Sequence, residues 1–193
     1  MISLDHFEKS CRDFVSNQDV QLQGWKFCVV DGGGVYLNVV KRCDTRVEVN
    51  VKECEELEFE EHDPSAVAVS NTSVIEFDFH IAYHKIFKVP FLLLRATVDG
   101  IQLGQQDIIQ HLSEGKDDWL PKELNHYTFL TQGEHPVLGT IYFYLHPCQT
   151  AELITTVTDR DFERIDYVAV WLSFFGRAVG LHVPMSSISN KKI

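Results

Sequence analysis

The clearest periodicity in this chain of 193 residues is a strict alternation of apolar and polar side chains between Ser73 and Phe87. One side of the pattern is apolar and consists of Ile75, Phe77, Phe79, Ile81 and Tyr83, and the other side carries Glu76, Asp78, His80, Ala82 and His84. Successive side chains of a β-strand point to opposite faces of the sheet, so the pattern predicts one long strand with one face on a core and one face in water. A covering layer must then pack on the apolar face, which limits the folds that the chain can adopt.

Shorter stretches with β-forming residues predict further strands at Trp25–Val30, Val35–Cys43, Pro90–Thr97 and Thr140–Leu145. Arg46–Val51 alternates as well, and it either extends the second of these strands or begins another. Asp31–Gly34 and Asp99–Gly100 predict tight turns, because glycine adopts the positive φ that such turns require. The predicted strands therefore follow one another as antiparallel hairpins.

Two segments near the ends of this strand series show helical periodicity. From Ile2 to about Ser16, apolar residues recur at helical spacing, with Ser3 as a candidate N-cap and Cys11 facing the core. Gln105–Ser113 predicts a short second helix that turns Ile108, Ile109 and Leu112 inward.

A third helix is predicted from a capping-box pattern at Thr158–Asp161. It should bury Phe162, Ile165, Ala169 and Leu172 and end near Gly176 or Gly180. The resulting order of elements predicts the α+β class, an antiparallel β-sheet with helices packed on one face.

Length and composition indicate one domain, residues 1–193, with a solvated acidic loop at about 53–73 and a frayed polar tail at about 185–193. Neither a membrane span nor a signal peptide is expected, since no run of about 18 apolar residues occurs and the N-terminus lacks basic and apolar regions. Five cysteines without close pairing favour a reducing compartment, which predicts a cytoplasmic protein. A net charge of −11 disfavours nucleic-acid binding and favours a basic partner or a lysine substrate.

The strongest candidate for chemistry is Cys148. The predicted strand Thr140–Leu145 runs into Pro147, which has no N–H and cannot continue a central ladder. A thiol placed directly after such a strand is both held firmly and accessible, which suits a nucleophile. A small apolar residue that closes the strand is the alternative interpretation, since free cysteine is commonly buried.

Two long motifs in the chain resemble the autophagy-related protein 10 family of ubiquitin-conjugating-type enzymes. The first motif is Glu134–Thr150, EHPVLGTIYFYLHPCQT, and the second is Val170–Pro184, VWLSFFGRAVGLHVP. A weaker similarity covers Val89–Leu94 and the following Asp99-Gly100, so the resemblance spans roughly the last hundred residues. The sister autophagy-related protein 3 family shares His-Pro-Cys, but it has a Lys-His type sequence where this chain has Gln149-Thr150.

The resemblance implies a ubiquitin-conjugating-enzyme-like core and a role for Cys148 as the thioester-forming residue. It also implies the partners: autophagy protein 12 as the modifier, autophagy protein 7 as the activating enzyme and autophagy protein 5 as the acceptor that provides a lysine. No cofactor is expected, and direct recognition of the acceptor without a separate ligase is implied.

The chain departs from ordinary ubiquitin-conjugating enzymes at the oxyanion donor. Those enzymes have a His-Pro-Asn motif, whereas here His135-Pro136 is followed by Val137. Candidate replacements are the backbone amides of Cys148 and Gln149, the Thr150 hydroxyl and Asn125, while His135 and His146 are interpreted as orienting the backbone around the site.

Other kinds of site have less support in the sequence. The histidines and cysteines lack the Cys-x(2–4)-Cys knuckles of structural zinc sites, which disfavours a metal centre. A cysteine-dependent hydrolase stays open, because one of nine histidines could pair with Cys148. A non-catalytic docking domain stays open as well, with the polar face of the long strand as its binding surface.

Overall fold

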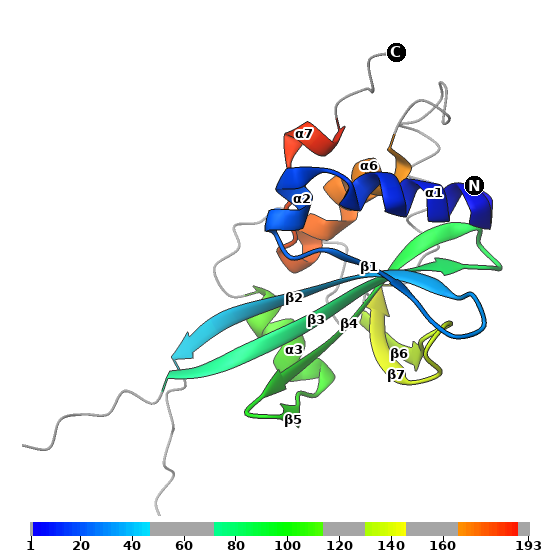
Figure 1. Ribbon diagram of the computed structural model, residues 1–193. Coiled ribbons are helices and arrows are strands. Elements are labelled where there is room, and N and C mark those ends of the chain that lie inside the picture. Colours follow the sequence, from blue (N-terminus) through cyan, green and yellow to red (C-terminus); the bar gives the residue numbers. More distant parts are fainter. Residues whose placement is uncertain (1, 47–71, 114–129, 146–165, 189–193) are drawn as a thin grey trace, which may run out of the picture.

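In the computed structural model, the described residues are 2–46, 72–113, 130–145 and 166–188, and they form an antiparallel sheet of seven strands with helices packed against it. The strands are β1 (Lys26–Val29), β2 (Val35–Arg46), β3 (Thr72–His84), β4 (Val89–Val98), β5 (Ile101–Gln102), β6 (Leu130–Glu134) and β7 (Ile141–Leu145). Their order in the sheet is β1-β2-β3-β4-β7-β6, and β5 pairs with the end of β4 (Figure 1). The predicted α+β class is thereby confirmed.

The long alternating segment is β3, and it lies in the middle of the sheet between β2 and β4. Its register places Phe79 opposite Val39 on one side and Leu94 on the other, so apolar residues of three strands share one face. The strand begins at Thr72, so Thr72 and Ser73 belong to the sheet, whereas the acidic loop was predicted to extend to about residue 73. The tip after β3 is a turn in which Lys88 has a positive φ of 53°.

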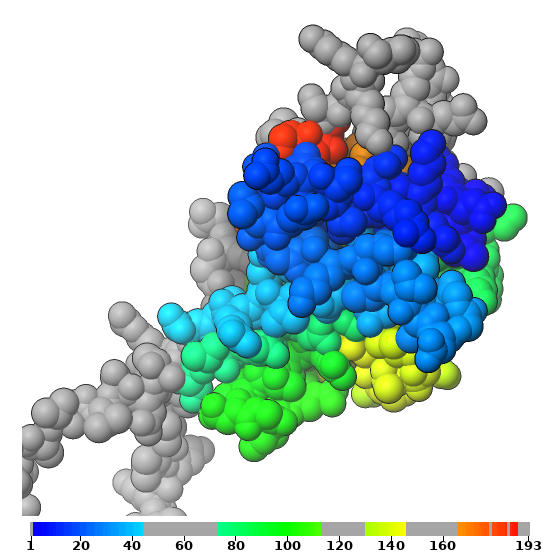
Figure 2. Space-filling view, viewed as in Figure 1, coloured from blue at the N-terminus to red at the C-terminus, as the bar shows by residue number. Residues whose placement is uncertain are grey.

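The helices are α1 (Leu4–Val15), α2 (Gln18–Leu22), α3 (Gln105–Ser113), α6 (Tyr167–Phe175), the 3-10 helix η1 (Gly176–Val179) and α7 (Met185–Ile188). Figure 1 shows α1, α2, α6 and α7 gathered over one face of the sheet. In Figure 2 the N-terminal segments, drawn in blue, form the upper part of the visible surface, above the cyan, green and yellow segments. The short helix α2 was not predicted.

The main core lies between this helical layer and the sheet. Helix α1 is capped as predicted, since the Ser3 hydroxyl accepts a hydrogen bond from the His6 amide at 3.1 Å. Its residues Phe7, Cys11 and Phe14 are fully buried, and α3 adds Ile108 and Ile109 to the same cluster. Burying each such phenylalanine stabilises the fold by about 2–3 kcal/mol.

Helix α6 begins later than we had predicted. Its N-cap is Asp166, whose backbone is extended and whose carboxylate accepts from the Ala169 amide at 3.1 Å. The same carboxylate accepts from Ser10 of α1 at 2.8 Å, and Ser10 in turn accepts from the Val168 amide. This tertiary contact stabilises Asp166 as the N-cap of the helix. The prediction of a single helix that runs on from Thr158 is therefore wrong. Ala169 and Leu172 are buried, as predicted.

Two further differences concern short elements. Strand β6 was not predicted, because Gln132, Gly133 and Glu134 carry no alternating apolar pattern and the strand is held by its pairing with β7. The predicted frayed tail is wrong for its first four residues, since Met185–Ile188 form α7 and Ser186 donates to Asp19 of α2 at 2.5 Å.

Candidate functional site

The candidate site begins at β7, the strand that leads to Cys148. Strand β7 pairs with β6 along its length and with β4 at Leu93↔Tyr144 and Leu94↔Phe143. Phe143 and Leu145 face the main core and are buried, whereas Tyr142 is buried on the opposite face. The predicted strand at Thr140–Leu145 is confirmed, and its last residue stands three positions before Cys148.

Most of the predicted site residues fall outside the described part of the chain. Cys148, His146, Thr150 and Asn125 lie in residues 114–129 and 146–165, and so do the Gln149 amide and the start of the predicted third helix. Their roles remain predictions. Along the chain, Cys148 follows the last residue of β7 by three positions.

Three of the other cysteines are described, and they differ in exposure. Cys11 is fully buried in α1, and burial, followed by the nearby carboxylates of Asp166 and Glu8, raises the pKa of its thiol well above the ordinary value. Since the thiolate is the reactive species, Cys11 is inert as a nucleophile. Cys28 is half-buried and Cys43 is exposed, and both are free thiols.

His135 is the predicted site residue that the structure does describe. It follows β6 directly, in the turn that joins β6 to β7, and its side chain is completely buried. Its Nδ1 accepts hydrogen bonds from the Val137 and Leu138 amides, both at 3.1 Å. These two bonds shape the turn, which agrees with the interpretation of His135 as a residue that orients backbone.

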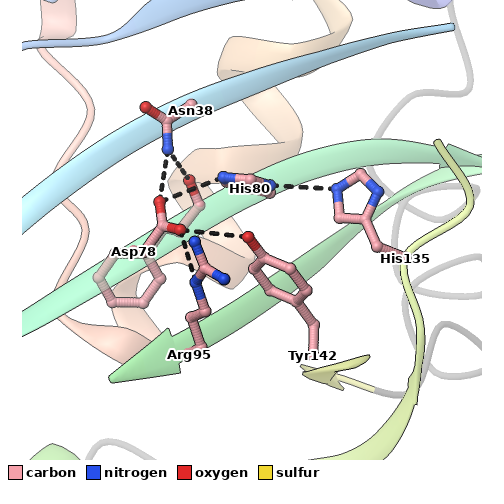
Figure 3. A network of polar contacts seen from close by, with 7 residues as sticks. Asn38, Asp78, His80, Arg95, His135 and Tyr142 are labelled. Carbon is pink, nitrogen blue, oxygen red and sulfur yellow. Dashed lines mark hydrogen bonds and ion pairs between the residues drawn. The ribbon is translucent and has the colours of Figure 1, made fainter. Parts of the chain in front are cut away.

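The other ring nitrogen of His135 continues into a network that we had not predicted (Figure 3). Its Nε2 lies 3.1 Å from Nδ1 of His80, and Nε2 of His80 lies 3.1 Å from Oδ1 of Asp78. A neutral imidazole has one N–H, and Nδ1 of His135 is an acceptor, so its proton is on Nε2 and is donated to His80. His80 then has its own proton on Nε2, which it donates to Asp78. This chain of three side chains, His135, His80 and Asp78, is called the relay below.

The Asp78 carboxylate is the end point of the relay and gathers donors from three more strands. Asn38 of β2 donates to Oδ1 at 2.6 Å, while Arg95 of β4 and Tyr142 of β7 donate to Oδ2 at 3.0 and 3.2 Å. Burial alone raises the pKa of Asp78, but the contacts with His80, the charge of Arg95 and the Tyr142 hydrogen bond outweigh it and lower the pKa to about 2. Asp78 is therefore ionised at neutral pH.

Burial has the opposite effect on His135. It lowers the pKa of the imidazole to about 4, and the positive charges of His80, when protonated, and Arg95 act in the same direction. The ring is neutral at pH 7, as the hydrogen-bond pattern requires. Because both its nitrogens are engaged and it is completely buried, His135 is unsuited to act as a general base.

The relay also corrects our description of the second face of β3. We expected this face to be wet, yet His80 and Ala82 are buried there. Ala82 belongs to a small second cluster, and His80 lies beside it. The buried members of this cluster are Ala82, Phe91, Leu93 and Tyr142, and the half-buried Tyr36, Leu138 and Tyr144 pack against them. The turn between β6 and β7 covers this cluster, and a Cβ added to Gly34 would lie 2.6 Å from Val137 of that turn.

Residues 6–186 match the family described as "Autophagocytosis associated protein, active-site domain". The chain belongs to this family. The matched span includes the relay, β7 and the segment that contains Cys148. The membership agrees with the resemblance stated above for the sequence motifs.

Relatives of the family are named ubiquitin-like-conjugating enzyme ATG10. The human protein is 35% identical over 119 residues, which is 60% of this chain and 53% of that protein. The Arabidopsis thaliana protein is 32% identical, over 58% of this chain and 52% of that protein. This member of the family thus spans about half the length of the curated relatives that it matches. A solved structure titled "Crystal structure of Autophagic E2, Atg10" aligns with a TM-score of 0.47 at 18% identity, over 93% of this chain and 98% of that one.

Two further observations concern other kinds of function. Among the described residues of this family member, no group of three or more His, Cys, Asp or Glu side chains could hold a metal ion. A search of the same residues finds no helix that is both long and apolar enough to cross a membrane.

Proposed function

We propose that this chain is a ubiquitin-like-protein conjugating enzyme that carries the C-terminus of a modifier as a thioester on Cys148. The observation that carries the proposal is the match of residues 6–186 to an active-site domain, because that span includes Cys148. The names of the human and Arabidopsis relatives support the same reaction. The placement of Cys148 three residues beyond a strand paired on both sides supports it further.

The first step is an exchange of thioesters. The Cys148 thiolate attacks the carbonyl carbon of the modifier's C-terminus, a new C–S bond forms, and the bond to the activating enzyme's cysteine breaks. The thiolate of the activating enzyme leaves and takes up a proton. One thioester replaces another, so the step is nearly balanced in free energy and requires no strongly acidified thiol.

The second step transfers the modifier to a lysine. The neutral amine attacks the thioester carbon, a C–N bond forms, the amine loses a proton, and Cys148 departs as thiolate. A lysine amine titrates near ~10.4, so only about one in 2,500 molecules is neutral at pH 7, and the acceptor amine must be desolvated or placed beside a carboxylate.

An oxyanion donor is also needed for the second step. His135 does not supply it, because its Nε2–H is donated to His80 and its Nδ1 is an acceptor. We assign the role to donors near the thiol, namely the Cys148 and Gln149 amides and the Thr150 hydroxyl, with Asn125 as a further candidate. His146 is assigned to orienting the backbone.

The identities of the partners rest on the family resemblance. We propose autophagy protein 12 as the modifier, autophagy protein 7 as the activating enzyme, autophagy protein 5 as the acceptor, and the cytoplasm as the compartment. The negative net charge of −11 is compatible with a lysine-bearing acceptor and disfavours a nucleic-acid partner.

The test is a thioester assay with the protein, activating enzyme, modifier and ATP, resolved on a gel without reductant. We expect a reductant-sensitive adduct that is lost in Cys148→Ala. In Cys148→Ser the adduct should resist thiols and be cleaved by alkali, because an oxygen ester replaces the thioester.

The matched controls are Cys28→Ser, Cys43→Ser and Cys54→Ser, each of which should keep the adduct. An adduct that maps to one of these cysteines would reject the assignment. Hydrolysis faster than transfer would favour a cysteine-dependent hydrolase, and acceptor binding without any adduct would favour a docking domain.

A further inference from the structure

Within the part of the chain that the structure describes, the β6–β7 hairpin joins the rest of the sheet through pairing of β7 with β4. Among the described residues, β7 pairs with β4 at two positions, Leu93↔Tyr144 and Leu94↔Phe143. By contrast, β3 and β4 pair without interruption from Ile75↔Val98 to His84↔Val89. Along this described part of the seam, side-chain contacts add to the two backbone pairs in setting the angle of the hairpin against the sheet.

The relay supplies contacts of this kind at the turn end of the hairpin. His135 binds the amides of the turn through Nδ1 and binds His80 of β3 through Nε2. Tyr142 of β7 donates to Asp78, the same carboxylate that His80 reaches. The turn and the strand of the hairpin are therefore both bound to one residue in the middle of the sheet.

The Asp78 carboxylate also accepts hydrogen bonds from the two neighbouring strands. Asn38 donates to it from β2 and Arg95 donates to it from β4. The Arg95 guanidinium also lies 4.9 Å from the centroid of the Tyr142 ring. Hydrogen bonds are directional, whereas apolar contacts are not, so this arrangement admits one orientation of the hairpin.

We infer that the relay of His135, His80 and Asp78 is a positioning element for the conjugating site, which sets the direction in which β7 leads the chain to Cys148. The inference rests on the function proposed above. Both ring nitrogens of His135 and both carboxylate oxygens of Asp78 are already engaged by described groups, so we assign the relay a positioning role and not a chemical one. It acts through β7, whose last residue is three positions from the thiol, and a misplacement of about 1 Å at a reacting group can reduce a rate up to about a hundredfold.

Two substitutions of His135 separate its two bonds. An asparagine amide matches the position of Nδ1, so His135→Asn keeps an acceptor for the turn amides and loses the bond to His80. A glutamine amide reaches the position of Nε2, so His135→Gln keeps a donor to His80. If the relay positions the hairpin, His135→Asn should slow loading of Cys148 about tenfold or more, and His135→Gln should stay within about threefold of the wild type.

The readout is single-turnover transfer from the activating enzyme at a temperature where both variants are fully folded. We expect the saturating rate of His135→Asn to fall while the concentration for half-saturation stays the same, since partner surfaces are unchanged. The control is Glu76→Gln, which lies on the same face of β3 but pairs with the exposed Arg42 at 2.9 Å, and it should load like the wild type.

Three outcomes would overturn the inference. The first is an equal loading rate in all variants. The second is a loss of loading rate that, in both His135 variants, simply follows the decrease in melting temperature. The third is a larger loss of loading rate in His135→Gln than in His135→Asn. The last outcome would mean that the turn bonds, and not the relay, carry the effect.

A second readout separates this inference from the proposed function. Alkylation of Cys148 by iodoacetamide, followed by peptide mapping, needs neither modifier nor activating enzyme. If the wild type formed no thioester, the proposed function would fail, yet the relay would still predict a changed Cys148 alkylation rate in His135→Asn and an unchanged rate in His135→Gln. An unchanged alkylation rate in both variants would overturn the relay's role by itself.

Discussion

The two faces of the central sheet are held by different kinds of interaction. The face under α1 and α6 carries the large apolar core, and residues such as Phe79, Leu92 and Leu94 are completely or almost completely buried there. The opposite face combines a small apolar cluster with the relay and its charged neighbours. Apolar packing tolerates small shifts of its parts, whereas a hydrogen-bonded network requires one arrangement, so the first face supplies most of the stability and the second supplies orientation.

The largest expected effect is on the helix-covered face. Phe79→Ala should lower the free energy of unfolding by about 3–5 kcal/mol, because it leaves a cavity in the middle of the core. Chemical denaturation measures the change. Phe174→Ala is the matched control, since that ring is exposed on α6 and should cost less than about 1 kcal/mol. Similar losses in both variants would contradict the placement of the core.

A smaller effect is expected on the second face. Asp78→Ala removes the shared acceptor of the buried His80 and Tyr142 and of the half-buried Asn38, and the loss of these bonds should cost about 2–4 kcal/mol of unfolding free energy. Glu76→Ala on the same strand face breaks only an exposed ion pair and should cost at most about 1 kcal/mol. If the two variants unfold at the same denaturant concentration, the network contributes nothing to the second face.

Acid should weaken the second face selectively. The pKa of His135 is lowered from 6.5 to about 4 on folding. Between these two pH values the unfolded chain binds a proton at this residue and the folded chain does not. Stability is therefore complete above pH 6.5 and decreases as the pH falls toward 4, by at most about 3 kcal/mol from this group. Unfolding measured between pH 7.5 and 4.5 should show a shallower slope in His135→Gln than in the wild type. Parallel slopes would contradict the neutral, buried state of the ring.

The smallest expected effect concerns the contact between two turns. Gly34→Ala would place a Cβ 2.6 Å from Val137 Cγ1, closer than any ordinary contact, and should cost about 1–2 kcal/mol. The double variant Gly34→Ala with Val137→Ala should recover most of that loss, which thermal unfolding can measure. A double variant that is less stable than the sum of the single changes would show that the turn does not pack as described.

Part of the fold could be predicted from local pattern. The alternation in β3, the Ser3 cap of α1 and the glycines of the turns act within a few residues, and each was confirmed. The start of α6 was missed because its cap, Asp166, is selected by Ser10, which is distant in the sequence. Strand β6 was missed because it is stabilised by pairing with β7 and not by its own residues.

For the candidate site, the sequence determined the strand that ends before His146, and the motif around Cys148 indicated the family. It could not indicate the relay or the donors that surround Asp78, because residues 38, 78, 80, 95 and 135 are up to about a hundred positions apart and share no spacing rule. Their only local signal is that His80 and Asp78 alternate with the apolar residues of β3. Whether such a polar face meets water or a covering turn depends on contacts between distant segments, and those contacts exist only once the sheet has folded.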